Sequence, residues 1–162
     1  MNATIDVSVD IVNASADKQI PAASDFQDWT RAALAALQAT GQSELCIRVV
    51  DEEESAQLNT GFRQKNGPTN ILSFPGPGIQ DGAWNMLGDL AICAPLVRRE
   101  AIEQNKSVNA HWAHLTVHGV LHLNGYDHEE TSAAQQMESL EIRILDTLGF
   151  GNPYHENEDS NE

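Results

Sequence analysis

Three histidines in the C-terminal half of the chain have the spacing of a metal site. They are three of the six histidines present and lie at His118, His122 and His128 in the segment HGVLHLNGYDH. Side chains four residues apart on a helix project from one face, so His118 and His122 can share one ion. Gly125 can adopt the positive φ that ends a helix and turns the chain back, which would bring His128 to the same ion. The spacing predicts a site for one divalent cation, and we expect one Zn²⁺ per chain.

The number of ligands distinguishes catalytic from structural zinc. Three protein ligands with a fourth position left open are typical of catalytic sites, whereas structural zinc usually has a fourth side chain as ligand. A structural site would need Asp127, His114 or a distant cysteine to complete the shell. A further alternative is that His118 and His122 are packed core histidines that hold no metal. We favour the catalytic interpretation.

The same spacing matches the zincin peptidase signature H-E-x-x-H-x-x-G-x-x-H at every position except one. Gly119 stands where the peptidases have their glutamate. That glutamate is the general base, and general acid–base catalysis is worth ~10²–10⁴-fold in rate. A bound zinc can still lower the pKa of water to ~7 and supply a nucleophile without a carboxylate. A metallopeptidase therefore remains an alternative that Gly119 disfavours.

Hydrophobic periodicity predicts the elements that must position these residues. Strand patterns occupy residues 5–11, 44–50, 68–78 and 82–96, and helical patterns occupy 22–40, 51–63, 97–105, 108–124 and 132–149. Strands interspersed with helices, followed by a helical C-terminal half, predict an α+β fold with a mixed β-sheet of about four strands covered by helices. The last two strands, 68–78 and 82–96, are expected to pair with each other. We expect residues 1–154 to form a single domain and residues 155–162 to be an acidic disordered tail.

Charge limits the partners that the chain can bind. With 9 basic and 24 acidic residues, the 162-residue chain has a net charge of −15. This disfavours DNA and tight binding to free RNA, because phosphates attract clustered Lys and Arg. Residues 63–106 nevertheless carry five basic against four acidic side chains, which allows a local basic surface. We therefore expect specificity for a nucleic acid to come from a protein partner or an assembled particle.

Targeting signals and cysteine usage indicate a cytoplasmic protein. The N-terminus alternates apolar and polar residues as a strand does and lacks the features of a signal peptide. No stretch approaches the ~20 apolar residues that cross a bilayer, so no membrane partner is expected. Cys46 and Cys93 lie in short apolar runs without Cys-x-x-Cys spacing and are expected to be free thiols in a reducing compartment.

Three segments resemble the YbeY family of bacterial endoribonucleases. These are HGVLHLNGYDH, FRQKNGPTNILSFP (62–75) and LGDLAI (87–92), and the resemblance extends over about residues 5–154. It implies a zinc-dependent, single-strand-specific endoribonuclease that acts on the 3′ end of 16S rRNA and in ribosome quality control. It also implies a zincin-like α+β fold, with His118, His122 and His128 as zinc ligands and Arg63 as the arginine implicated in activity. The expected partners are single-stranded rRNA and the small ribosomal subunit or an associated protein.

Residues of the second segment can be given roles at a phosphodiester. Arg63 could hold the non-bridging oxygens, on which charge collects in the transition state, although a surface salt bridge with the acids at 51–54 is an alternative. Lys65 could attract phosphate or simply be exposed. Thr69 and Asn70 could donate hydrogen bonds to the substrate or only shape the turn. A non-catalytic ribosome assembly factor, whose zinc only stabilises the C-terminal half, is the remaining alternative.

Overall fold

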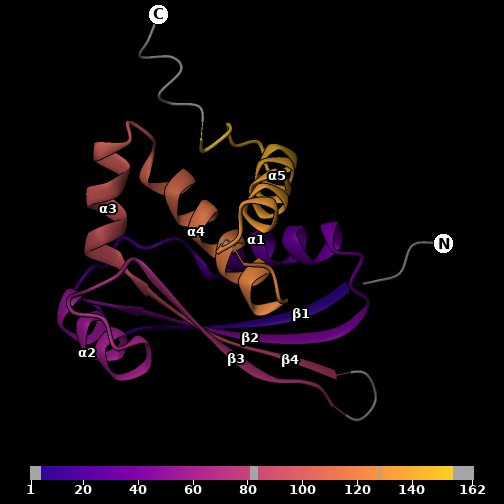
Figure 1. The fold of residues 1–162 in the computed structure, drawn as a ribbon, viewed down its shortest axis with the longest axis horizontal. Helices are drawn as coiled ribbons and strands as arrows, with labels where there is room; N and C mark the ends of the chain where they lie inside the picture. The colour runs from indigo at the N-terminus through magenta and orange to yellow at the C-terminus, as the bar shows by residue number, and fades with distance from the viewer. Residues whose placement is uncertain (1–4, 81–83, 128, 155–162) are drawn as a thin grey trace, which may run out of the picture.

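A four-stranded mixed sheet forms the base of the molecule (Figure 1). The computed structural model describes residues 5–80, 84–127 and 129–154. The strand order is β1-β2-β4-β3, in which β1 and β4 run parallel to β2, and β3 is antiparallel to β4. The bounds are β1 Ile5–Asn13, β2 Gly41–Val50, β3 Ile71–Gln80 and β4 Trp84–Cys93. The predicted α+β fold class and the predicted pairing of the last two strands are confirmed.

Five helices accompany the sheet in the described part of the chain. They are α1 (Ala23–Ala36), α2 (Glu52–Arg63), α3 (Ala94–Glu103), α4 (Val108–Leu123) and α5 (Thr131–Thr147). Figure 1 shows α1, α4 and α5 gathered on one side of the sheet, with α2 apart from them beside one end of the strands. No helix of the described residues has the length and apolar character needed to span a bilayer. The acidic tail predicted at 155–162 lies outside the described residues.

The boundary between β4 and α3 differs from the expectation of a strand extending to residue 96. β4 ends at Cys93, and α3 begins at Ala94 with a proline in its first turn. Proline has no amide hydrogen and is favoured at the first helical positions, where that hydrogen has no partner within the helix. Pro95 therefore starts the helix, whereas the sequence pattern had assigned it to the strand.

Helix α4 runs through the centre of the fold and carries the predicted ligands. Its buried residues lie on several sides because it packs against β3 and β4 as well as α1, α3 and α5. Trp112, 1% exposed, makes an edge-to-face contact with Phe26 of α1 at a centroid distance of 5.7 Å. The Ser107 side chain accepts a hydrogen bond from the Ala110 amide and caps the first turn. The predicted ligands His118 and His122 therefore lie on a buried helix that is held in place by packing on several sides.

The C-terminal end of α4 has the turn that the sequence predicted. Gly125 has φ +96°. Its amide donates to the His122 carbonyl, and the Tyr126 amide donates to the Leu121 carbonyl, which together form a Schellman motif. A side chain at Gly125 would be strained at this φ. Glycine therefore allows the chain to turn back immediately after the ligand helix.

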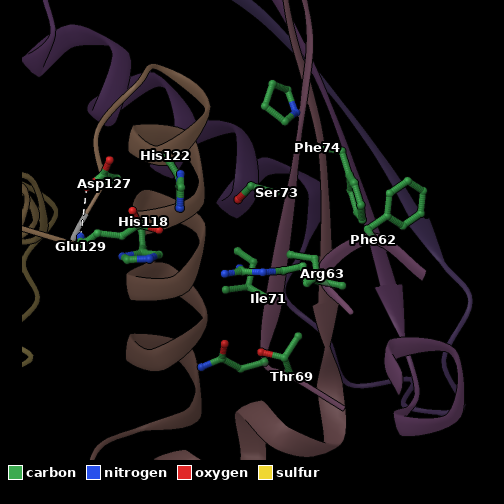
Figure 2. Close-up of a pocket in the computed structure, with 13 residues that line it drawn as sticks. Phe62, Arg63, Thr69, Ile71, Ser73, Phe74, His118, His122, Asp127 and Glu129 are labelled. Atoms are coloured by element: carbon green, nitrogen blue, oxygen red, sulfur yellow. Dashed lines mark hydrogen bonds between the residues drawn. The ribbon is translucent and has the colours of Figure 1, made fainter. Parts of the chain in front are cut away.

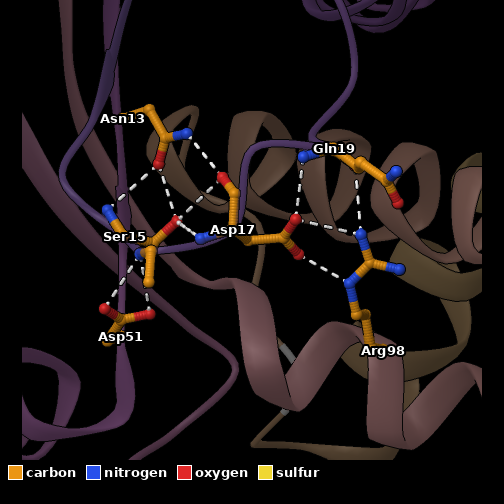
Figure 3. Close-up of polar contacts among 7 residues, drawn as sticks. Asn13, Ser15, Asp17, Gln19, Asp51 and Arg98 are labelled. Atoms are coloured by element: carbon orange, nitrogen blue, oxygen red, sulfur yellow. Dashed lines mark hydrogen bonds and ion pairs between the residues drawn. The ribbon is translucent and has the colours of Figure 1, made fainter.

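A polar network fastens the segment after β1 to α3 (Figure 3). The Asp17 carboxylate accepts hydrogen bonds from Arg98 Nε at 2.6 Å and Nη2 at 3.0 Å. The Ala16 amide donates to Asp51, the residue before α2. This network connects three elements that surround one end of the sheet.

We expect Asp17→Asn to lower the free energy of unfolding at neutral pH by about 0.5–1 kcal/mol, because Arg98 is more than a third exposed and water screens the pair. The hydrogen bond from Arg98 lowers the pKa of Asp17 in the folded state. The stabilisation is therefore complete above the unfolded pKa of ~3.9 and is lost as the pH falls through the lower folded value. Urea denaturation between pH 7 and pH 3 measures the free energy of unfolding of both proteins, and the difference between them should become smaller in acid. The exposed Asp28→Asn is the control, and an unchanged difference across this range would contradict the assignment.

Candidate active site

A pocket of about 550 Å³ lies between α4 and β3 (Figure 2). His118 and His122 line it from α4, and Arg63 lines it from the last residue of α2. Thr69 and Asn70, which precede β3, also line it. Three separate parts of the chain thus bring five of the predicted site residues to one cavity, while Lys65 and His128 are treated below.

The two histidines of the pocket stand one helical turn apart. Their ring centroids are 6.1 Å apart with an interplanar angle of 84°. His118 is 20% exposed at its side chain, and its Nδ1 lies 2.6 Å from Oε2 of Glu141 on α5. Because that nitrogen is engaged with a carboxylate, Nε2 is the atom of His118 left for a ligand bond.

Glu141 is a fully buried carboxylate shared by three side chains. Besides His118, its Oε1 lies 2.9 Å from His114 Nε2 and accepts a hydrogen bond from the Tyr154 hydroxyl. Burial alone would raise the pKa of Glu141, but the hydrogen bonds from His114 and His118 outweigh it and lower the pKa to about 2. A carboxylate only accepts hydrogen bonds, so the network assigns the proton of His118 to Nδ1 and the lone pair to Nε2. This is the tautomer that a metal ligand needs.

Sequence reasoning missed Glu141, although a signal was present. In the helical pattern of α5, position 141 falls on the same stripe as the buried Met137, Ile144 and Leu145. A carboxylate on an apolar stripe must have buried partners, because an unpaired buried charge is strongly destabilising. The same helix carries exposed acidic residues such as Glu138 and Asp146, so Glu141 did not stand out in the sequence.

The turn after α4 contributes two carboxylates. Asp127 and Glu129 both line the pocket, and the Glu129 amide donates to Asp127 Oδ1 at 3.0 Å. This local bond is one that an Asp in a turn commonly makes. His128, the third predicted ligand, lies outside the described residues, between these two. Its role as a ligand therefore stays a prediction.

The donor chemistry of the pocket fits a divalent cation. Imidazole nitrogens and carboxylates are zinc ligands, and both kinds occur here. Arg63 is the single Lys or Arg among the described lining residues, against the two acids Asp127 and Glu129, so a cation would be needed to make the cavity attractive to a phosphodiester. Among the described residues, which exclude His128, no three His, Cys, Asp or Glu side chains are arranged to hold a metal ion. A complete ligand set therefore requires a donor beyond them.

Arg63 is directed to the pocket by the way α2 ends. The next residue, Gln64, adopts the left-handed conformation with φ 57° and ends the helix. The alternative salt bridge with the acidic run is not formed in the described structure, because Glu52 pairs with Arg99 at 2.6 Å and Glu54 pairs with Arg48 at 2.5 Å. Arg63 therefore lies at the cavity without an ion pair to a described residue.

The remaining residues of the second segment differ in position. Two hydrogen bonds with Ser55 hold the backbone of Thr69 in place. The Ser55 hydroxyl donates to the Thr69 carbonyl at 2.8 Å and accepts from the Thr69 amide at 2.9 Å. Asn70 donates from Nδ2 to Glu100 at 3.1 Å. Lys65 is exposed and is not one of the residues that line the pocket. Thr69 and Asn70 thus join the cavity through a rigid turn, whereas Lys65 stands outside it.

A second histidine–carboxylate pair supports the wall of the site. His111 Nε2 lies 2.8 Å from Oε1 of Glu100, the carboxylate that also holds Asn70. Burial would raise the pKa of Glu100, but the hydrogen bonds from His111 and Asn70 outweigh it, and the pKa is lowered. The pair connects α3, α4 and the start of β3. His111 is therefore a packed histidine with a structural partner.

Gly119 faces the sheet, where an added side chain would collide with two apolar side chains. A Cβ atom built there would lie 2.7 Å from Leu90 Cδ2 and 2.8 Å from Ile71 Cδ1. Leu90 is fully buried, so it has no open space to move into. The position that holds the general base in the zincin signature is thus occupied by helix–sheet packing, which argues against the peptidase alternative.

Comparison with known proteins shows the family to which the chain belongs. The profile of the family described as Endoribonuclease YbeY matches residues 10–149. A protein of that name from Coxiella burnetii is 48% identical over 151 residues, covering 93% of this chain and 99% of its own length. Its counterpart in Nitrosococcus oceani is 51% identical over 150 residues, covering 91% and 97% of the two chains. The chain belongs to the Endoribonuclease YbeY family.

A solved structure shares the fold of this YbeY family member. The solution structure of TM1509 from Thermotoga maritima aligns with a TM-score of 0.55 at 22% identity, covering 87% of this chain and 91% of that one. At this identity the likeness concerns the fold alone. The resemblance seen in the sequence and the predicted enzyme class, an endoribonuclease, are confirmed by the family match.

The packing at Gly119 in this YbeY family member gives a stability prediction. We expect Gly119→Ala to lower the free energy of unfolding by up to about 2 kcal/mol, because overpacking costs about 1–3 kcal/mol and the gain in helix propensity offsets about 1 kcal/mol of this. Gly61→Ala on α2 is the matched control, since its Cβ would meet nothing within 4 Å, and it should stabilise the protein. Chemical denaturation measures both. Equal stabilisation by the two substitutions would show that α4 has room to move away from the sheet.

The buried carboxylate gives a prediction about metal affinity. We expect Glu141→Gln to weaken metal binding ~10–100-fold, the usual effect of removing a partner that orients a ligand histidine. An amide can donate as well as accept and no longer fixes the proton of His118 on Nδ1. Competition with a chromogenic chelator measures the affinity, and the exposed Glu138→Gln on the same helix is the control. Lower thermal stability with unchanged metal affinity would assign Glu141 a purely structural role.

Proposed function

We propose that this chain is a zinc-dependent endoribonuclease that cleaves single-stranded rRNA, with one Zn²⁺ held by His118, His122 and His128. The observation that carries the proposal is the joint position of His118, His122 and Arg63 in one pocket. The two imidazoles proposed to bind the ion thereby share a cavity with a guanidinium, an arrangement that supports binding of a phosphodiester. The bound ion would supply positive charge for the phosphate oxygens and activate the nucleophile.

The residues of the chain have distinct tasks in this proposal. Arg63 holds the non-bridging oxygens of the phosphate, whose charge grows in the transition state, through two parallel N–H donors. Glu141 keeps the ring of His118 in one orientation and one tautomer. Asn70 and Thr69 form the fixed wall beside which the ribose lies, and Lys65 at the surface attracts the approaching backbone.

Membership in the family supports a role in rRNA maturation. We propose the 3′ end of 16S rRNA in the cytoplasm as the site of cleavage, and ribosome quality control as a second role. A chain with a net charge of −15 gains little from free RNA, so the small ribosomal subunit or a protein bound to it would present the substrate. Residues 1–154 would act as one domain, with no role assigned to residues 155–162.

Cleavage mapping with controlled metal content tests this function. Purified protein should cut single-stranded RNA after addition of Zn²⁺, lose activity with a chelator, and leave a matched duplex intact. A 2′,3′-cyclic phosphate on the product would identify the ribose 2′-hydroxyl as the nucleophile, whereas cleavage of a substrate with a 2′-deoxyribose at the scissile bond would identify water. The same assay on small subunits measures the contribution of the particle. Failure to cut either substrate at any metal content would refute the proposal.

A further inference from the structure

Two phenylalanines form an aromatic ledge at the border of the active-site pocket. The rings of Phe62 and Phe74 meet edge to face, with centroids 4.8 Å apart and an interplanar angle of 70°. Both residues line the pocket that contains His118 and His122. Phe62 is 68% exposed, which is unusual for a large aromatic side chain.

The position of the ledge follows from two elements that also build the pocket. Phe62 immediately precedes Arg63 at the end of α2, and Phe74 lies on β3 directly after Ser73. In Figure 2, Arg63 lies between the two histidines and the phenylalanine pair. A backbone phosphate held by Arg63 would therefore have the ledge within reach of a neighbouring nucleotide.

The ledge continues into an apolar hollow beyond the pocket. A second cavity of about 370 Å³ is lined by the same two phenylalanines and by Leu58, Val12 and Ala91, and its lining also includes Asp89 and the Arg48–Glu54 ion pair. The ledge thus lies between a mixed cavity, which contains the histidines and Arg63, and a cavity whose surface is mainly apolar. Single-stranded nucleic acids present this alternation, because each nucleotide joins a charged phosphate to a flat apolar base.

The negative net charge of this chain makes base–aromatic stacking an important source of affinity for RNA. Arg63 is the one Lys or Arg side chain among the described lining residues of the pocket, and the whole chain carries a net charge of −15. Affinity for RNA therefore gains little from the phosphate contacts that dominate most nucleic-acid complexes. Base–aromatic stacking is worth ~1–3 kcal/mol per base and does not depend on the net charge of the protein.

We propose that the Phe62–Phe74 ledge binds the base of a nucleotide next to the scissile phosphate, with the base stacked on Phe62. The proposal rests on the RNA-cleaving function proposed above and assigns it a base-binding site. Phe74 fixes the ring of Phe62 through the edge-to-face contact, so the base meets a rigid surface. A paired base is already stacked within its duplex, whereas an unpaired base is free to turn onto the ring. The ledge therefore contributes to the selection of single strands.

A cycle of protein and RNA changes tests the ledge by binding, independently of cleavage. The probe is a short single-stranded 2′-O-methyl oligonucleotide, which lacks the 2′-hydroxyl, and the protein is loaded with Zn²⁺. Fluorescence anisotropy measures Kd for wild type and for Phe62→Leu, Phe62→Trp and Ile102→Ala. Ile102 is 75% exposed on α3, is not among the residues lining the pocket, and serves as the matched control.

We expect Phe62→Leu to weaken binding ~5- to 150-fold, as for the loss of one base–aromatic stack, while Phe62→Trp and Ile102→Ala bind as wild type does. An abasic site is placed at each position of the oligonucleotide in turn. At one position, the missing base should weaken binding to wild type by a similar factor, whereas the Kd of Phe62→Leu should not change. The proposal would be overturned if the abasic site weakened binding equally in wild type and in Phe62→Leu. It would also be overturned if Phe62→Leu bound the intact oligonucleotide with the Kd of wild type. Failure of the cleavage assay with this binding pattern intact would refute the proposed function while preserving the ledge.

Discussion

Replacing His122 with alanine is expected to reduce RNA cleavage by ~10³-fold or more and to remove most of the bound metal. The pocket contains two described histidines, and the loss of one leaves too few imidazoles to hold an ion against solvent and chelators. Stabilisation of transition-state charge by a metal is worth several kcal/mol, and each 1.36 kcal/mol changes the rate tenfold. Elemental analysis and cleavage rates on one preparation connect the two effects.

The control for His122→Ala is Asn109→Ala, an exposed substitution on the same helix that should leave metal and rate unchanged. Thermal unfolding shows whether the variant is folded, and wild type stripped of metal serves as its reference. If His122→Ala bound metal and cleaved RNA as wild type does, the pocket would not be the metal site. A variant that is inactive but fully metal-loaded would instead assign His122 to the substrate.

Arg63→Ala is expected to lower kcat ~10²–10³-fold, as the removal of a donor to a developing oxyanion does. The effect should be larger on kcat than on KM, because the charge on the phosphate oxygens grows as the transition state forms. Metal content should be unchanged. Arg63→Lys should recover only part of the rate, since a lysine offers a point charge where the guanidinium offers two parallel donors. Single-turnover kinetics on a defined oligonucleotide separate the two constants.

Arg31→Ala is the matched control, because Arg31 is exposed on α1 and does not line the pocket. A change in KM alone that disappears at high salt would contradict the assignment to the transition state. It would show that Arg63 only attracts the substrate, as was considered for Lys65. Equal rates for Arg63→Lys and wild type would likewise show that a positive charge suffices.

The features that could be predicted from the sequence are those set by local spacing. The separation of four between His118 and His122 on a helical pattern places both rings on one face, as the structure has it. The positive φ of Gly125 also follows from the local pattern, because a glycine after the last periodic residue commonly ends a helix. The pairing of β3 with β4 was predictable from their order along the chain.

The features that could not be predicted depend on contacts across the fold. Arg63 lies 55 positions before His118, and only the resemblance to a family suggested that they meet. Lys65 was considered for phosphate attraction or simple exposure, and it lies outside the pocket because the left-handed conformation of Gln64 turns the chain after Arg63. Glu141 required knowledge of how α5 packs on α4, which periodicity alone does not supply.

The missing side chain at Gly119 limits the width of the pocket between α4 and β3. Because this residue lets α4 pack directly on Leu90 and Ile71, the separation of the helix from the sheet is set by hydrophobic contact. Such a separation cannot increase without disrupting the hydrophobic interior. In the proposed function, this fixed width would admit a single strand and exclude a duplex before any bond is broken.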